Sequence, residues 1–329
     1  HRTPVTGHAH PMTQLATTQP PDPQPSPPPK RRGRWLRGFC SFLLLVILVG
    51  IALRLTVRDS VAAVAPIFYA LPPLVLAFLA MLAGLGFAWR HARRRGVVCA
   101  LLAVALLGWG VMQHLSVRSP IGAANGLSVC TWNVSHGWAG WDGISAVLAE
   151  DDADIVGLVE AAMGETARQT LRDAMPEHTL LEGGYGLAFL VRGACGQPEI
   201  LTLSDGSRCL RLDATCRDLP LSVLLVDIDG NPLSDRSQAI DTLRGIANGI
   251  TDRPVIVMGD FNTPRDSAHF DAWTRRYRNA SDSPGCGWRA SWPTVAPVLQ
   301  IDHIWHSNDL HAQRCSDGWS FQSDHRRVG

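Results

Sequence analysis

The sequence predicts an α/β fold, a mixed-sheet sandwich covered by helices, preceded by three transmembrane helices. Two observations support this prediction. Long apolar runs fill most of residues 39–115, and after residue 120 short apolar segments alternate with helical ones. Several of the later apolar segments end in polar residues, and α/β sheets bind their ligands beyond the strand ends.

The charge is divided unequally between the two parts of the chain. Residues 1–120 contain thirteen Lys or Arg but only Asp22 and Asp59 as acids, which leaves 17 basic and 27 acidic residues for 121–329. A basic surface is the electrostatic signature of nonspecific nucleic-acid binding. The acidic second part therefore disfavours that class of function.

Residues 1–38 form a Pro-rich, basic tail with few large apolar residues. Such a segment cannot bury enough apolar surface to fold, so we expect it to be disordered. Its run Pro20–Pro29 favours extended polyproline II, for which a plain spacer is a better interpretation than a docking site for a proline-reading domain.

Three apolar runs predict a membrane anchor over residues 39–115, namely Phe39–Val57, Val61–Trp89 and Val97–Leu115. A signal peptide is the alternative for the first run, but that run is long for one and no clear cleavage site follows it. The second run carries Pro66, Pro72 and Pro73, and it is long enough to tilt or to begin irregularly.

Basic residues predict the orientation of the anchor. They cluster before the first span and again at Arg90–Arg95, between the second and third spans. The positive-inside rule therefore makes the tail cytoplasmic and residues 121–329 extracytoplasmic, in a multi-pass protein of the cell (inner) membrane. Arg54 is the only charged residue within the spans and lies near an end, so the spans are interpreted as an anchor rather than a transporter.

Residues 121–329 have the size of one α/β domain, and apolar patterning gives its elements in order. We expect a helix capped by Asp142 and further helices from 165, 236 and 269. The strands expected are Leu127–Val134, Ile155–Val159, Gly186–Val191, Cys209–Ala214, Leu221–Ile228, Val255–Asn262 and Leu299–Trp305.

Six of the eight cysteines lie in this domain. In an extracytoplasmic domain they permit disulfides, and Cys195–Cys209 or Cys209–Cys216 could close short loops. Six buried thiols are an equally good interpretation. The domain has no CxxC and no Cys/His spacing typical of zinc sites, which disfavours a structural zinc.

The stretch Val255–Asn262 (VIVMGDFN) is the strongest local indication of a site. Its apolar run predicts a buried strand, and Asp260 and Asn262 leave the end of that strand on the same face. Gly259 is expected to let the backbone approach whatever occupies the cleft. The alternative is an ordinary strand with an Asp-Asn turn.

Polar residues also end three other predicted strands or lie within them. Asn133 follows CTW, Glu160 follows IVGLV, and Asp302 and His303 lie within LQIDHIW. A further cluster, Ser323-Asp324-His325, stands near the end of the sequence. His303 and His306 are interpreted as structural, and the tryptophans mainly as packing residues, with Trp138 and Trp141 the best candidates for a stacking surface.

The chain resembles the endonuclease/exonuclease/phosphatase superfamily of Mg²⁺-dependent phosphoesterases. The matching motifs stand in the family's order and are TWNV (131–134), DIVGLVE (154–160), GDFN (259–262), IDHI (301–304) and SDH (323–325). The resemblance implies a four-layer α-β-β-α (DNase I-like) sandwich. The segment GWRASWP (287–293) and the preceding spans are similar to the membrane-anchored bacterial branch.

The resemblance also implies a metal site and a substrate site. Glu160 is expected to be the main carboxylate ligand of Mg²⁺ (or Mn²⁺), with Asn133 and Asp324 beside it. Asn133 and Asn262 are expected to contact the phosphate of the substrate. The metal would neutralise charge that develops on the phosphoryl oxygens.

The catalytic residues implied by the resemblance are Asp260, Asn262, Asp302, Asp324 and His325. Asp260 would orient or deprotonate the attacking water. His325 would be the catalytic histidine, with Asp302 fixing its tautomer. The function implied is hydrolysis of phosphomonoesters or phosphodiesters; the substrate, whether nucleic acid, lipid or small metabolite, stays open, and no protein partner is predicted.

Two departures from the family pattern bear on this function. Most relatives have a histidine at the end of the strand VLLVDID, where this chain has Asp227 or Asp229. That histidine usually contacts the phosphate, which makes Asp227 a candidate substrate-binding residue. An aspartate there would repel the substrate, bind a second cation or weaken catalysis, so a binding or sensory domain of the same fold is the alternative function. The sequence also stops at Gly329, so we expect the family's closing strand to be missing or incomplete.

Overall fold

The structure is a computed structural model that describes residue 1, residues 32–118 and residues 126–329. The Pro-rich tail expected over residues 1–38, including Pro20–Pro29, lies almost wholly outside the described residues.

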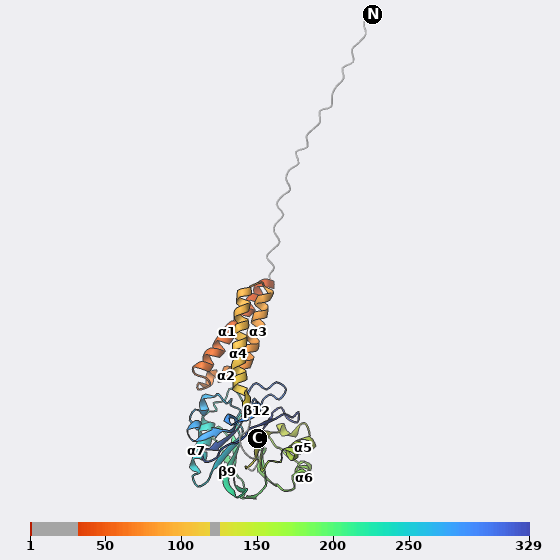
Figure 1. Cartoon of the computed structure of the whole chain (residues 1–329), viewed down its shortest axis with the longest axis vertical. Helices are drawn as coiled ribbons and strands as arrows, with labels where there is room; N and C mark the ends of the chain where they lie inside the picture. The colour runs from red at the N-terminus through yellow and green to blue at the C-terminus, as the bar shows by residue number, and fades with distance from the viewer. Residues whose placement is uncertain (2–31, 119–125) are drawn as a thin grey trace.

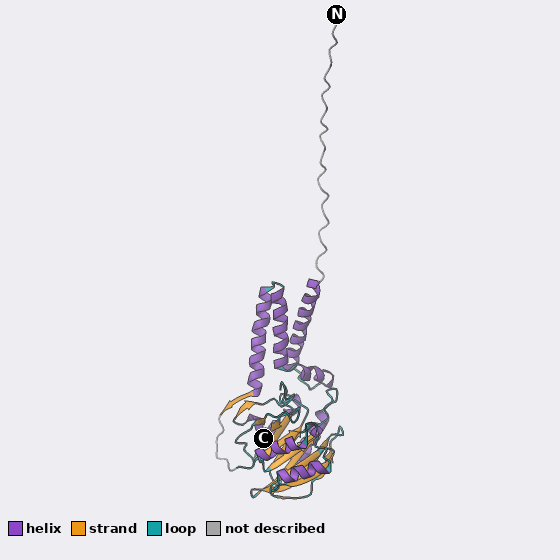
Figure 2. Ribbon diagram, turned by 90° about the vertical axis from the view of Figure 1, so that its right-hand side faces the viewer, coloured by secondary structure: helices purple, strands orange, loops and turns teal. Residues whose placement is uncertain are grey.

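Long apolar helices form the first part of the described chain. They are α1 (Arg32–Leu55), the short α2 (Ala65–Ala70), α3 (Pro73–Trp89) and α4 (Arg93–His114). Two of these, α1 and α4, are long and apolar enough to cross a membrane, and α2 with α3 makes a third candidate that is bent by 64° at its break. Figures 1 and 2 show α1, α3 and α4 side by side at one end of the α/β domain.

The helices pack through small and apolar side chains. Ile47, Leu76, Ala80 and Leu106 are buried between them, whereas large apolar residues such as Leu85 face outward. An apolar outer surface is what lipid contact requires. The helical bundle therefore has the surface expected of membrane spans.

Two β-sheets form the α/β domain. The six-stranded sheet has the order β14 (Asp317–Gly318), β15 (Arg327–Val328), β2 (Val129–Asn133), β3 (Ile155–Val159), β5 (Leu187–Val191) and β4 (Thr179–Gly184). The seven-stranded sheet has the order β11 (Tyr277–Asn279), β13 (Asp302–Ser307), β10 (Val255–Asp260), β9 (Leu219–Asp227), β8 (Arg208–Cys216) and β6 (Ala194–Cys195), with β7 (Glu199–Thr202) also paired to β8. Both sheets mix parallel and antiparallel pairs.

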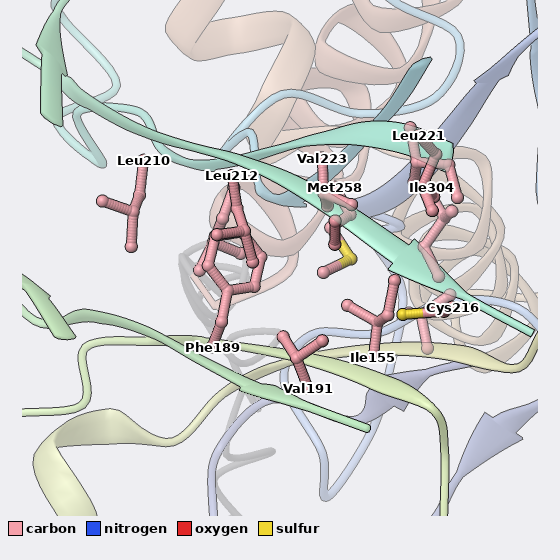
Figure 3. Close-up of a cluster of buried hydrophobic side chains, with 14 of the residues drawn as sticks. Ile155, Phe189, Val191, Leu210, Leu212, Cys216, Leu221, Val223, Met258 and Ile304 are labelled. Carbon is pink, nitrogen blue, oxygen red and sulfur yellow. The ribbon is translucent and has the colours of Figure 1, made fainter. Parts of the chain in front are cut away.

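The main hydrophobic core lies between the two sheets. Figure 3 shows Phe189 and Val191 of β5 reaching toward Leu212 of β8, with Met258 of β10 beside them. Gly157 of β3 leaves the room that the Met258 and Leu225 side chains fill, since a Cβ there would lie 2.6 Å from the methyl carbon of Met258. The sheets are therefore packed closely face to face.

Helices cover the outer face of each sheet. The helices α5 (Trp141–Asp151) and α6 (Glu165–Ala174) pack on the six-stranded sheet, and α7 (Ser237–Gly249) packs on the seven-stranded sheet with the short turns η3 (Ala268–Phe270) and η4 (Trp273–Arg275). In Figure 1 they lie on opposite sides of the domain. The predicted four-layer α-β-β-α sandwich is confirmed.

Three local expectations were wrong. Helix α5 begins at Trp141 after Gly140, so Asp142 lies in its first turn instead of capping it. The helix expected from His269 to Arg275 is two 3-10 turns, because Phe270 and Trp273 both point into one buried aromatic cluster. The strand expected from Leu299 begins at Asp302, since Leu299 bridges to Trp292 instead.

The two short-range disulfides are also wrong, because the cysteines concerned are free. Cys209 and Cys216 lie seven residues apart on β8, so their side chains point to opposite faces of the sheet. Cys209 packs under α7, whereas Cys216 lies in the core between the sheets.

The helical bundle and the α/β domain are joined by a strand pair as well as by the chain. Directly after α4, β1 (Leu115–Arg118) pairs antiparallel with β12 (Gly285–Trp288). The ring of His114, at the end of α4, lies 5.4 Å from that of Trp288. The last helix therefore continues directly into the domain that carries the polar strand ends.

Candidate active site

Five polar strand ends meet at one edge of the sandwich. In the seven-stranded sheet Asp260 lies opposite both Asp302 and Asp227 in the strand register. In the six-stranded sheet Asn133 ends β2 beside the end of β3, which Glu160 follows. Parallel alignment of β2 with β3 and of β9 with β10 explains why these ends coincide.

Asp260, Asp302 and His325 form the buried centre of this edge. Nδ1 of His325 lies 2.9 Å from Oδ2 of Asp302, and its Nε2 lies 3.8 Å from Oδ2 of Asp260. Both carboxylates are almost completely buried. One ligand atom from each of the three residues falls within 4.8 Å of the others, so the group could hold a metal ion.

His325 is held in place by the six-stranded sheet. The indole nitrogen of Trp132 donates to the carbonyl of His325 at 3.0 Å. Ser323 Oγ accepts from the His325 N–H at 3.0 Å and donates to the carbonyl of Asn133 at 2.7 Å. The loop that carries His325 is therefore fixed to the end of β2, which accounts for the Ser at the start of the SDH motif.

Asn133 links the two sheets. Its amide nitrogen donates to Oε1 of Glu160 and to Oδ2 of Asp260, both at 3.0 Å, while its oxygen accepts from the Ser135 N–H at 2.9 Å. Glu160 has a left-handed backbone (φ 52°), which turns it away from the strand direction and toward the site. His136 Nε2 lies 3.3 Å from the other Glu160 oxygen.

Asp324 has no direct contact with Glu160 or Asp260 among the hydrogen bonds of the site, and it binds Ser135 and Trp292 instead. One of its oxygens accepts from Ser135 Oγ at 2.7 Å, and the other from the indole nitrogen of Trp292 at 3.3 Å. Because Ser135 also binds Asn133, Asp324 is connected to Glu160 and Asp260 through two polar residues. Asp324 is therefore linked to the cluster of Asp260, Asp302 and His325 through hydrogen bonds and does not belong to it.

Asn262 is held on the side of the seven-stranded sheet. Its backbone N–H donates to Oδ1 of Asp260 at 2.8 Å, and its side-chain amide donates to the carbonyl of Ile228 at 2.8 Å. The backbone of Asn262 is left-handed (φ 48°), so the chain turns sharply after Phe261. A Cβ at Gly259 would lie 2.2 Å from the Val226 carbonyl oxygen, so at this glycine the chain approaches the Val226 backbone of β9 closely.

Only one of the two aspartates at the end of β9 reaches the site. Asp227 is in register with Asp260. Asp229 instead closes its own loop, accepting from the Asn231 N–H and from Ser234 Oγ. Asp227 is therefore the one of the two aspartates that stands where the family resemblance predicts a histidine.

The crowded carboxylates perturb one another. Burial, together with the Glu160 carboxylate, raises the pKa of Asp227 to about 7. Burial and the Asp302 carboxylate likewise raise the pKa of Asp260 to about 8. Burial alone would lower the pKa of His325, but the charges of Asp302 and Asp260 raise it to about 10. The site is therefore a cluster of carboxylates that favours the cationic form of His325.

Comparisons with known proteins agree with this arrangement. A model of the Endonuclease/Exonuclease/phosphatase family matches residues 130–325. The chain belongs to the endonuclease/exonuclease/phosphatase family. Proteins of this family are generally metal-dependent phosphoester hydrolases. A comparison with curated proteins found no match.

Solved structures show the same fold. A Bacteroides thetaiotaomicron protein of the endonuclease/exonuclease/phosphatase family is 17% identical, with a TM-score of 0.53 over 61% of this chain and 95% of that one. A mannosyl-6-phosphatase from Bacteroides thetaiotaomicron VPI-5482 is 17% identical, with a TM-score of 0.52 over 62% of this chain and 98% of that one. The predicted DNase I-like fold is thus confirmed.

Several neighbours of the site were not predicted. Ser135 and His136 follow the TWNV motif directly, and Ser291 Oγ accepts from the backbone N–H of Asp302 at 3.2 Å. The sequence signals that could have found them are adjacency to TWNV for Ser135 and His136, and a place within the segment GWRASWP for Ser291. His303 is structural, as expected, because it is fully buried and bonded to the Thr263 carbonyl.

Exposed aromatic residues stand on the loops next to the site. Trp138 is 67% exposed and Phe321 is 68% exposed, five residues after Asn133 and three before Asp324. Trp141, by contrast, packs against α5's own core. Of the two tryptophans considered for a stacking surface, Trp138 is the accessible one.

Proposed function

We propose that this chain is a membrane-anchored, extracytoplasmic, Mg²⁺-dependent phosphoesterase. It would hydrolyse phosphomonoesters or phosphodiesters by direct in-line attack of water, without a covalent intermediate. The single observation that supports this best is the convergence of Asp260, Asp302 and His325 from motifs far apart in the sequence, within reach of Glu160.

The donor set suits a hard divalent cation such as Mg²⁺. Glu160 offers a half-exposed carboxylate, and Asn133 holds it beside Asp260. Burial, and after it the charges of neighbouring carboxylates, raise the pKa values of Asp227 and Asp260, and a bound cation would offset both effects by stabilising the ionised carboxylates. We propose Glu160 as the main ligand, with Asn133 and Asp324 supporting it through their hydrogen bonds. The bound ion would supply charge neutralisation at the phosphoryl oxygens.

The remaining residues would act on water and phosphate. Asp302 would accept a hydrogen bond from Nδ1–H of His325. The Nε2–H of His325 would then be directed toward Asp260 and the scissile phosphate. Asp260 would orient and deprotonate the attacking water, since a base works best with a pKa near the working pH. The amide of Asn262 would contact a phosphate oxygen next to it.

Hydrolysis by the full chain in lipid nanodiscs tests this proposal. The substrates would be bis-(p-nitrophenyl) phosphate, p-nitrophenyl phosphate, plasmid DNA and a phospholipid, each with Mg²⁺ and with EDTA. Turnover that EDTA, Glu160→Ala and His325→Ala each abolish would support the proposal, and the panel would rank the substrates. A folded chain that turns over none of them with Mg²⁺ or Mn²⁺ would reject it.

A binding or sensory domain is the second candidate function. The observation that favours it is Asp227, a carboxylate facing Glu160 and Asp260 where the family's histidine is expected. This candidate predicts binding of a phosphate ester without turnover. The same nanodisc assay, combined with calorimetric titration of the substrates, separates the two functions.

A further inference from the structure

The second membrane helix is broken where two prolines follow each other. Helix α2 ends at Ala70 and α3 begins at Pro73, with a bend of 64° between them. Pro72 has no N–H, so it cannot bond the carbonyl of Phe68 four residues earlier, as a continuous helix would require. The break therefore leaves backbone carbonyls without helical partners inside the anchor.

Arg54 supplies the missing donors. Its Nη2 donates to the Phe68 carbonyl and its Nε to the Leu71 carbonyl, both at 2.8 Å. The guanidinium also lies 4.2 Å from the centre of the Phe68 ring. The Arg54 side chain is only 2% exposed, so it is buried in the break as a charge with hydrogen-bond partners.

The third nitrogen of Arg54 reaches the α/β domain. Nη1 donates to Oδ2 of Asp266 at 2.6 Å, and Gln113 near the end of α4 donates to the same oxygen at 3.2 Å. One buried guanidinium thus connects the end of α1, the break in the second helix and the catalytic domain. Removing one partner of such a pair leaves the other without compensation.

The residues next to Asp266 are held from the same side. Asp59, in the turn after α1, accepts from Ser267 Oγ at 2.5 Å and from the Ala268 N–H at 2.8 Å. Tyr69 of α2 donates to the same carboxylate at 3.1 Å. Three consecutive residues of the domain, 266–268, are therefore fixed by the anchor.

This segment is continuous with the catalytic turn. Asp266 follows Asp260 by six residues, and the residues between them bond to the strand entry before Asp302. The Phe261 N–H donates to the Ile301 carbonyl at 3.0 Å, and the Arg265 N–H to the Gln300 carbonyl at 3.1 Å. A shift of Asp266 would therefore move Asp260 relative to Asp302 and His325.

We propose that Arg54 is a positioning residue, which holds the turn that carries Asp260 and Asn262 in register with Asp302 from within the membrane anchor. This inference rests on the proposed hydrolase function for its catalytic readout. It assigns the anchor a part in arranging the site, beyond attachment of the domain to a bilayer.

The test uses the full chain in lipid nanodiscs, with kcat and KM for bis-(p-nitrophenyl) phosphate at saturating Mg²⁺. Arg54→Gln and Asp266→Asn should each lower kcat about tenfold to a hundredfold with little change in KM, because a misplacement near 1 Å has that effect. Arg54→Lys keeps the charge but not the fork of donors, so it should recover part of the loss. The double variant should be no slower than either single variant.

Asp271→Asn is the matched control, since Asp271 lies in the same segment and pairs with Arg58 in an exposed ion pair. Its kcat should stay within about twofold of the wild type, as expected of exposed pairs. Hydrogen exchange of the backbone over residues 261–268 gives a readout that needs no turnover. Exchange should quicken in Arg54→Gln and Asp266→Asn but not in Asp271→Asn.

Two results would overturn the inference: wild-type exchange over 261–268 in both Arg54→Gln and Asp266→Asn, or losses of kcat that add in the double variant. If Arg54→Gln does not insert into the nanodiscs, Arg54→Lys and Asp266→Asn are compared with the wild type instead. A wild-type chain without turnover would reject the proposed hydrolase function alone, and the exchange measurement would still decide the role of Arg54.

Discussion

Nδ1 of His325 lies 2.9 Å from Oδ2 of Asp302, although the two residues belong to different sheets. Asp302 begins β13 of the seven-stranded sheet, whereas His325 precedes β15 of the six-stranded sheet. The pair therefore closes the sandwich at the edge where the other polar strand ends lie. The charge and the tautomer of His325 both follow from its contact with Asp302.

Replacing Asp302 by Asn should lower kcat by about a hundredfold or more, because His325 loses the acceptor that fixes its tautomer. Loss of the Asp302 charge also lowers the pKa of His325, one of whose main raising influences is Asp302. The alkaline limb of the pH–rate profile should therefore move to lower pH. A profile that keeps its alkaline limb in Asp302→Asn would contradict this role.

Replacing Glu160 by Gln should weaken the binding of Mg²⁺ that activity requires. The glutamine amide has the shape of the Glu160 carboxylate, and its contact with Asn133 becomes a neutral one. The negative charge that would bind the metal is lost. We expect the Mg²⁺ concentration for half-maximal rate to rise about tenfold or more. Glu165→Gln, on the exposed start of α6, is the matched control and should leave the Mg²⁺ titration unchanged.

The metal-free protein should lose stability as the pH rises above about 6.5. In the unfolded chain the protons of Asp227 and Asp260 leave near pH 4 and that of His325 near about pH 6.5. The folded site keeps them to about pH 7, 8 and 10, respectively. The folded state binds more protons at these three groups, so their contribution to the free energy of unfolding falls between about pH 4 and pH 10. Below about pH 6.5 His303 acts in the opposite direction, because burial lowers its pKa to about 4.

Thermal unfolding in EDTA at a series of pH values measures this effect. Asp227→Asn removes one of the repelling carboxylates, so the variant should unfold at a higher temperature than the wild type at pH 8 without metal. The difference should shrink when Mg²⁺ is added, since a bound cation stabilises the wild-type carboxylates. A lower unfolding temperature for metal-free Asp227→Asn at pH 8 would refute this account of the site.

Two glycine substitutions should act in opposite directions. Gly259→Ala should destabilise by roughly 3 kcal/mol or more, since its φ is 130° and its Cβ would lie 2.2 Å from the Val226 carbonyl oxygen. Gly245→Ala lies in α7 with open space around its Cβ, so it should stabilise by roughly 0.5–1 kcal/mol. Unfolding temperatures of both variants, measured side by side, check the pair; equal effects would be inconsistent with the close approach of β10 to β9.

The sequence predicts the fold and the site residues for reasons that are local. The buried strand Ile155–Val159 and the helix Glu165–Ala174 match in their bounds, because apolar periodicity determines each of them. Asp260 and Glu160 stand out because a polar residue ends a continuous apolar run. Their meeting is a consequence of parallel strand ends, which the sheet order in the structure establishes.

Other features have no local signal. Arg54 and Asp266 are 212 residues apart, and nothing near either residue indicates the other. The choice between Asp227 and Asp229 depends on where β9 ends and on the turn that Ser234 stabilises. The exposed edge strands β4 and β7 lack the apolar runs of the buried strands, so the pattern that identified the others could not identify them.

The two sheets each carry about half of the site: Asn133 and Glu160 stand on one, and Asp227, Asp260 and Asp302 on the other. Their relative alignment is set by the side chains between them, among them Phe189 and Met258 (Figure 3). The rate of turnover therefore depends on how accurately the two sheets are aligned. A conservative substitution deep in this core, many residues from any carboxylate, should therefore slow hydrolysis more noticeably than it lowers the stability of the fold.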